Sequence, residues 1–81
     1  MKTDTIKGII IEEILNIAPD AEESEIPEDD RLQNAIEFDS YDFLSLLTAL
    51  NERLGVEVPE ADYGSVDTLN HMVEYMQQRI E

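Results

Sequence analysis

Apolar residues recur at spacings of three and four in three separate stretches of the sequence, which is the pattern of amphipathic helices. The spacing predicts helices over residues 4–17, 40–54 and 67–80. Residues 56–59 predict a short extended connection, and the sequence shows no strand pattern. The sequence therefore predicts an all-α fold, with residues 1–81 forming a single domain.

Each predicted helix has one apolar face. On the first helix this face comprises Ile6, Ile9, Ile10, Ile14 and Ile17, and Ile11 and Leu15 widen it. The face of the second helix comprises Phe43, Leu46, Leu47, Leu50 and Leu54. On the last helix it comprises Leu69, Met72, Val73, Met76 and Ile80. Three such faces are enough to enclose one small core.

The ends of the predicted helices carry residues that cap helices. Asp4 or Thr5 can cap the first helix, and Ser65 or Asp67 can cap the last. Asp39 can cap the second helix, with Asp42 three positions later in its first turn. Gly55 is placed for a left-handed C-terminal cap.

The connections differ greatly in length. Residues 19–39 show no clear period and are rich in Asp and Glu, so we expect a long acidic loop held to the core by Ile26, Leu32 and Ile36. Residues 59–63 predict a single helical turn that Gly64 ends. The expected architecture is a four-helix bundle with three longer helices, one short third helix and a long acidic loop after helix one.

The charge balance excludes some partners and favours others. Five basic residues stand against 20 acidic ones, a net charge of −15. Such a chain repels nucleic acid and attracts proteins with basic surfaces. No apolar run is long enough to cross a bilayer, and the first four residues lack a signal-peptide pattern. We therefore expect a monomeric cytoplasmic protein that does not insert into membranes.

The sequence lacks the residues that most catalytic and metal sites need. There is no Cys, and the single His71 falls opposite the apolar face of its helix, where we expect it to be exposed. The acidic stretch 20–31 has no Gly at the sixth position of a calcium-binding loop. No glycine-rich phosphate loop is present. We expect neither a metal site nor an enzyme.

Residues 38–44 combine an Asp-Ser pair with the start of the strongest predicted helix, in the order Phe-Asp-Ser-Tyr-Asp-Phe-Leu. Together with residues 49–60 and 73–76, this segment resembles the acyl carrier protein family. The resemblance implies that Ser40, preceded by the motif residue Asp39, receives 4′-phosphopantetheine from coenzyme A. The start of a helix suits that role, because its free N–H groups and dipole favour a phosphodiester.

The family resemblance also implies the protein's function. Its arm would hold acyl intermediates as thioesters and present them to partner enzymes. Expected partners are a phosphopantetheinyl transferase and acyl-loading and acyl-transfer enzymes with basic docking surfaces. An aminoacyl or D-alanyl carrier of the same fold is an alternative. An acidic helical inhibitor of the immunity type is another, although it would not need a hydroxyl at a helix start.

Two further sets of residues are candidates for contacts with partner proteins and with the cargo. A strip on the second helix is expected to meet partners and comprises Tyr41, Asp42, Leu44 and Thr48. An alternative to this contact role is that Leu44 packs against residues of the loop. The candidate cargo pocket comprises Leu46, Leu50, Val58, Tyr63, Val66 and Met72.

Several positions depart from the family pattern. Tyr41 follows the serine where the family usually has an aliphatic residue, and Ser45 and Arg53 stand where acidic residues are common. Tyr63 and Met72 replace small residues and would narrow the pocket. We therefore expect a specialised stand-alone carrier that serves a dedicated lipid or metabolite pathway.

Overall fold

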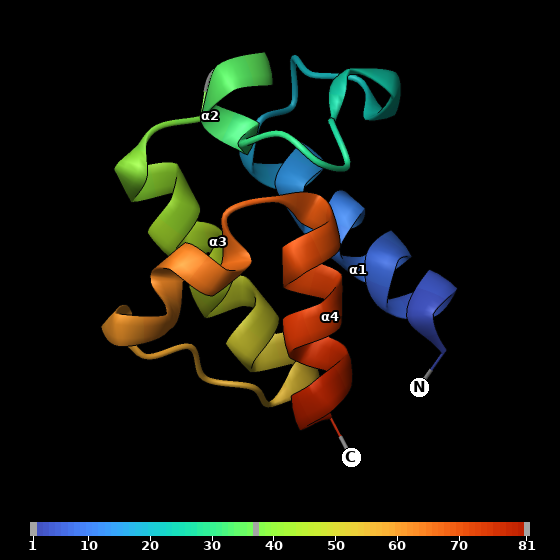
Figure 1. Cartoon of the computed structure of the whole chain (residues 1–81). Coiled ribbons are helices and arrows are strands. Elements are labelled where there is room, and N and C mark those ends of the chain that lie inside the picture. The colour runs from blue at the N-terminus through green and yellow to red at the C-terminus, as the bar shows by residue number, and fades with distance from the viewer. Residues whose placement is uncertain (1, 37, 81) are drawn as a thin grey trace.

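The computed structural model describes residues 2–36 and 38–80, which form helices joined by loops (Figure 1). In chain order the elements are α1 (Thr3–Ile17), η1 (Glu23–Glu25), α2 (Leu32–Ala35), α3 (Ser40–Leu54), η2 (Glu60–Val66) and α4 (Leu69–Arg79). Within the described residues the only β-type pairing is an isolated bridge between Arg31 and Thr68. The predicted all-α bundle is confirmed.

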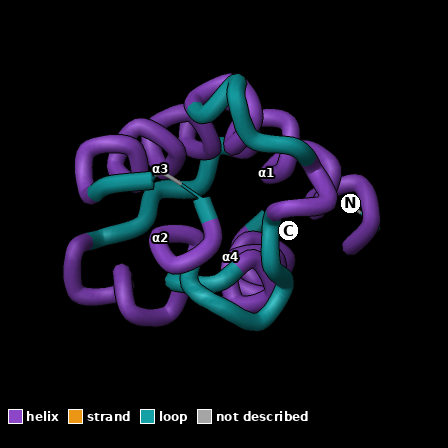
Figure 2. Tube along the Cα trace, turned by 90° about the horizontal axis from the view of Figure 1, so that it is seen from above, coloured by secondary structure: helices purple, strands orange, loops and turns teal. Residues whose placement is uncertain are grey.

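Helix α1 packs against both α3 and α4. Seen from above, α4 is viewed nearly along its axis, and α1 and α3 lie to one side of it (Figure 2). Ile6, Ile10 and Ile14 are fully buried, as expected for residues four apart on one helix face. Ile11 and Leu15 also pack against the core, so α1 is covered on more than one side.

The predicted faces of the other two long helices also enter the core. Leu46, Leu47 and Leu50 of α3 are buried, whereas Phe43 and Leu54 pack at its margin. The buried residues of α4 are Leu69, Met72, Val73, Tyr75 and Met76. Tyr75 was not expected there. Its ring can be buried because its hydroxyl donates a hydrogen bond to Asp62 at 2.7 Å.

Arg53 joins α3 to α1 at the surface. Its Nη1 lies 2.6 Å from Glu12 Oε1 and 2.8 Å from Glu13 Oε2. These hydrogen bonds, to Glu13 and then to Glu12, raise the pKa of Arg53. The basic residue that departs from the family pattern therefore links two helices.

Two of the predicted N-terminal caps are wrong. Helix α1 begins at Thr3, so Asp4 and Thr5 lie in its first turn and Lys2 is the cap residue without a side-chain bond. Helix α4 is capped by Thr68 rather than by Ser65 or Asp67. A cap residue needs an extended backbone, and Thr68 has φ −123° and ψ 164°, whereas Asp67 is still helical.

The short helix before α4 is longer than predicted. It runs over Glu60–Val66, past Gly64, which was expected to end it. Gly64 does not have the positive φ that ends helices, and the side chain of Val66 is fully buried. Burial of Val66 therefore extends the helical conformation into the approach to α4.

The acidic loop is more ordered than its sequence suggests, because η1 and α2 both lie within residues 19–39. Ile26 and Leu32 are buried, and Ile36 packs against the core, as predicted. The loop is also hydrogen-bonded to α4. The backbone N–H of Asn70 donates to the carbonyl of Glu28 at 2.9 Å, and its Nδ2 donates to Asp29 Oδ1 at 2.6 Å.

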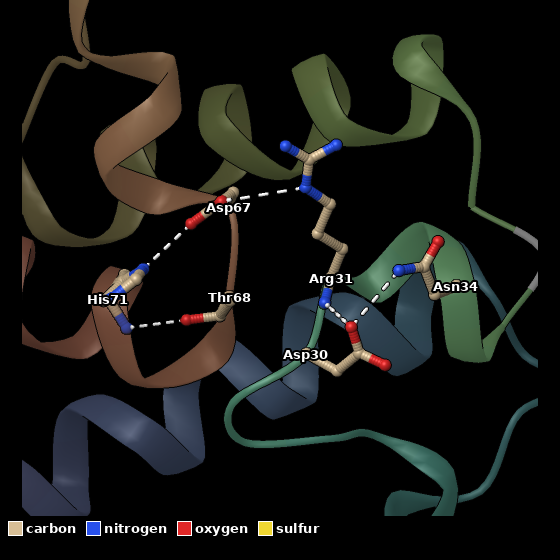
Figure 3. A network of polar contacts seen from close by, with 6 residues as sticks. All are labelled: Asp30, Arg31, Asn34, Asp67, Thr68 and His71. Atoms are coloured by element: carbon tan, nitrogen blue, oxygen red, sulfur yellow. Dashed lines mark hydrogen bonds and ion pairs between the residues drawn. The ribbon is translucent and has the colours of Figure 1, made fainter.

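A polar network joins the end of this loop to the start of α4 (Figure 3). Asp67 lies at its centre, with one carboxylate oxygen 3.8 Å from Arg31 Nε and the other 2.9 Å from His71 Nδ1. His71 is exposed, as predicted, and Asp67 is its partner one turn earlier. The hydrogen bond between them raises the pKa of His71 and lowers that of Asp67.

Substitution of two glycines by alanine should have opposite effects on stability. Gly55 has φ 71° and ψ 21°, a left-handed conformation, so Gly55→Ala should lower the free energy of unfolding by about 1–2 kcal/mol. Gly8 lies inside α1, and a Cβ there meets nothing within 4 Å. Gly8→Ala should therefore raise the free energy of unfolding by about 0.5–1 kcal/mol. Urea denaturation measures both, and changes of the same sign would contradict this account.

The His71–Asp67 pair should make stability depend on pH. Because folding raises the pKa of His71, its stabilisation is fully present below the unfolded value of about 6.5. The stabilisation is lost as the pH rises through the higher folded pKa. Urea denaturation of the wild type and His71→Gln at several pH values isolates this contribution. The wild type should gain relative to the variant as the pH falls from about 8 to about 6, and a constant difference would refute the coupling.

Candidate functional site

The start of α3 is fixed by two reciprocal hydrogen bonds. Asp39 Oδ1 accepts from the backbone N–H of Asp42 at 2.8 Å, and Asp42 Oδ2 accepts from the N–H of Asp39 at 3.4 Å. The first bond confirms the predicted cap, and the second completes a capping box. A side-chain cap of this kind contributes about 1 kcal/mol. It defines where the helix begins and therefore which residue follows the cap.

Ser40 is the first residue of α3 and is exposed. The N–H groups of Ser40 and Tyr41 have no intrahelical acceptor, because the first helical bond runs from Phe43 to the carbonyl of Asp39. An exposed hydroxyl beside free N–H groups and the positive end of a helix dipole fits an esterified phosphate. The residues present therefore fit a phosphodiester on Ser40.

The predicted partner strip lies at the surface beside Ser40. Tyr41 is 75% exposed and Leu44 is 45% exposed. The two residues line a shallow hollow along α3 together with Thr48, whose hydroxyl donates to the Leu44 carbonyl at 3.0 Å. This exposure speaks against the alternative in which Leu44 packs under the loop. Asp42 is half-buried, and its carboxylate takes part in the capping box.

The residues predicted to form a cargo pocket lie in two different environments in the structure. Five of them are buried members of the core, namely Leu46, Leu50, Val58, Val66 and Met72. Tyr63 alone of the predicted set lines a cavity of about 210 Å³ next to the start of α3. The other lining residues are Arg31, Leu32, Gln33, Phe38, Phe43, Gly64 and Asp67.

Sequence reasoning did not assign Phe38 and Phe43 to this cavity. The apolar spacing predicts Phe43 on the core face of its helix, and Phe38 enters the prediction only as the first residue of the segment that resembles the family. The two rings bracket Ser40 in the chain, with Phe38 buried and Phe43 at the margin of the core. The sequence signal for this cavity is the pair of large apolar side chains on either side of the candidate attachment residue.

The part of the chain that the structure describes holds no group of three or more His, Asp or Glu side chains arranged as metal ligands. Nor does any helix in residues 2–36 and 38–80 have the length and apolar character needed to cross a bilayer.

Comparison with known proteins identifies the family. A family model described as a phosphopantetheine attachment site matches residues 4–76. An acyl carrier protein of Campylobacter fetus subsp. fetus is 33% identical over 75 residues, which cover 90% of this chain and 88% of the relative. Acyl carrier proteins of Wolinella succinogenes and of Sulfurovum sp. (strain NBC37-1) are 28% and 27% identical over 74 residues. These alignments cover 91% of this chain and 91% and 92% of the respective relatives. The chain therefore belongs to the acyl carrier protein family, whose members bear a phosphopantetheine arm and are carriers rather than enzymes.

Proposed function

We propose that Ser40 is the residue that carries the arm and that the protein presents thioester-bound intermediates to partner enzymes. The observation that supports this most strongly is the position of Ser40. It is an exposed serine directly after a capped helix start, within the segment that the phosphopantetheine family model matches. When bound, the arm supplies a terminal thiol that holds the cargo as a thioester.

Each residue at the start of α3 has a distinct part in this proposal. In the transfer from coenzyme A, the Ser40 oxygen forms the new bond to the phosphate of the arm, the diphosphate P–O bond breaks, and adenosine 3′,5′-bisphosphate leaves together with the hydroxyl proton. Asp39 keeps the first turn of the helix closed, so the hydroxyl stays at the surface within reach of a transferase. The N–H groups of Ser40 and Tyr41 are placed to stabilise the phosphate charge.

Recognition by partners is proposed to use shape and charge together. Tyr41, Leu44 and Thr48 offer a partly apolar surface next to Ser40, and exposed apolar patches of this kind mark contact sites. The net charge of −15 speeds encounter with basic surfaces on the transferase and on cargo-transferring enzymes. Asp42 supplies a carboxylate within the strip, and Asp39 supplies another two residues before Tyr41. An aminoacyl or D-alanyl carrier would use the same residues.

Incubation with coenzyme A and a broad-specificity phosphopantetheinyl transferase should add one phosphopantetheine to the wild-type chain. Ser40→Ala should abolish the mass gain, because the reacting oxygen is gone. Ser65→Ala is the matched control, since Ser65 is also exposed but lies in η2, and it should be modified like the wild type. Intact-mass spectrometry is the readout. A full mass gain in Ser40→Ala would refute the assignment.

Leu44→Ala should weaken the reaction with the transferase while leaving the fold intact. Loss of an exposed apolar contact should lower kcat/KM about five- to tenfold, with less than about 1 kcal/mol lost from the free energy of unfolding. Leu46→Ala is the contrast, because Leu46 is fully buried in the same helix and should cost about 2–5 kcal/mol of stability. Transferase kinetics and urea denaturation followed by circular dichroism separate the two effects. If Leu44→Ala reacts at the full rate, the strip is not used by this enzyme.

A further inference from the structure

An open hollow lies between the end of α1, the loop around η1 and the end of α2. These segments and the start of α3 gather at the same end of the bundle (Figure 1). The apolar wall of the hollow includes Ile17, Ala18 and Ile36, which are half-buried and pack against the core. Part of their apolar surface therefore remains accessible to solvent. The other lining residues are Pro19, Asp20, Ala21, Glu25 and Ala35.

The charged side chains on the wall of the hollow are negative. Asp20 and Glu25 are both exposed, and none of the described residues that line the hollow is basic. The carboxylate of Glu25 is held in position by the backbone N–H of Glu22, which donates to its Oε1 at 2.8 Å. A carboxylate can accept several hydrogen bonds, so that of Glu25 has room for further donors. The rim of the hollow therefore attracts a cation and can accept its hydrogen bonds.

The last carbonyl groups of α1 lack part of their usual hydrogen bonding. The helix ends at Ile17, and its last turn contains no basic residue. Pro19 has no N–H, so the carbonyl of Leu15 lacks its usual donor four residues later. The N–H of Ala21 donates to the carbonyl of Ala18 at 3.0 Å, which is one residue short of a helical bond. The negative end of the helix dipole therefore favours a cation that comes from outside the chain.

The side chain that matches these features best is arginine. Its methylene groups can lie against the apolar wall while its guanidinium stays at the polar rim. Five N–H donors in a planar fork suit a site that offers carboxylates and carbonyl groups together. The ammonium group of lysine is compact and strongly hydrated, so it would give up more hydration on entering the hollow.

The hollow is close enough to Ser40 for one enzyme to cover both. Ile36 is four residues before Ser40, and an extended chain spans at most about 3.6 Å per residue, so their Cα atoms lie within about 14 Å of each other. A protein interface of standard size covers about 800 Å² on each partner, which is roughly 30 Å across. An enzyme whose active site reaches the Ser40 hydroxyl can therefore also contact the end of α1.

We propose that the hollow at the end of α1 receives an arginine side chain of the phosphopantetheinyl transferase while that enzyme acts on Ser40. This proposal rests on the proposed function of Ser40. It adds a second contact, which is separate from the strip of Tyr41, Leu44 and Thr48 on α3. The strip supplies apolar contact, whereas the hollow supplies a defined place for one positive charge.

Binding of a free arginine derivative tests the hollow itself. Nα-acetyl-arginine amide is titrated into the nitrogen-15-labelled chain, and the backbone amide shifts are followed by NMR. Saturable shifts should centre on the residues that line the hollow, and Nα-acetyl-citrulline amide, which lacks the charge, should cause none. The double variant Asp20→Asn/Glu25→Gln should lose these shifts. The Gln side chain can still accept the N–H of Glu22, so the loop should keep its conformation.

Kinetics with the transferase test the docking role. Transfer of phosphopantetheine from coenzyme A to Ser40 is timed at low ionic strength by intact mass. Asp20→Asn/Glu25→Gln should lower kcat/KM about three- to tenfold. Glu57→Gln/Glu60→Gln is the matched control, because it removes the same two charges from exposed positions where α3 connects to η2. The control should stay within about twofold of the wild type, since it changes only the net charge.

The two measurements have distinct unfavourable outcomes. Shifts that spread over the acidic surface without saturation, or that the citrulline amide reproduces, would overturn the arginine site. Equal kcat/KM for the two double variants would overturn its docking role. If the wild-type chain itself gains no mass, the proposed role of Ser40 fails instead, while the NMR titration still tests the hollow.

Discussion

Burial of an isoleucine ridge on α1 is the interaction on which the rest of this small bundle depends. Ile6, Ile10 and Ile14 are fully buried, and α1 is the helix that contacts both α3 and α4. Fully burying one such side chain contributes about 1.5–3 kcal/mol. That gain must exceed the mutual repulsion of 20 acidic residues, which only five basic residues offset. Arg53 and Lys7 lessen the repulsion where they pair with Glu12, Glu13 and Glu28.

The core determines where Ser40, the proposed attachment residue, lies. Leu46 and Leu50 fix the rotation of α3, and the Asp39–Asp42 capping box fixes its first residue. Ser40 is therefore placed at the surface by a rigid element rather than by a mobile loop. The same rotation turns Tyr41 and Leu44 outward and brings Phe43 against Tyr63. One helix thus supplies the proposed attachment residue, the exposed strip and one wall of the cavity.

The sequence predicted the parts of the fold that depend on local pattern. The periodicity gave the three long helices, and local cap chemistry gave Asp39 and Gly55. The sequence did not predict the short elements whose positions depend on tertiary contacts. Helices η1 and α2 have too few residues to show a period. Thr68 replaced the expected caps because η2 extends to the buried Val66. The cavity was missed for the same reason, since Phe38, Phe43 and Tyr63 meet only after the chain folds.

The central claim is that α3 presents Ser40 as the single attachment point, and mapping the modification on the wild-type chain tests it most directly. After reaction with coenzyme A and a transferase, proteolytic fragments are sequenced by tandem mass spectrometry. The account predicts that the added phosphopantetheine resides on the fragment containing Ser40 and on that residue. Its presence on Ser24, Ser45 or Ser65 instead would contradict the account.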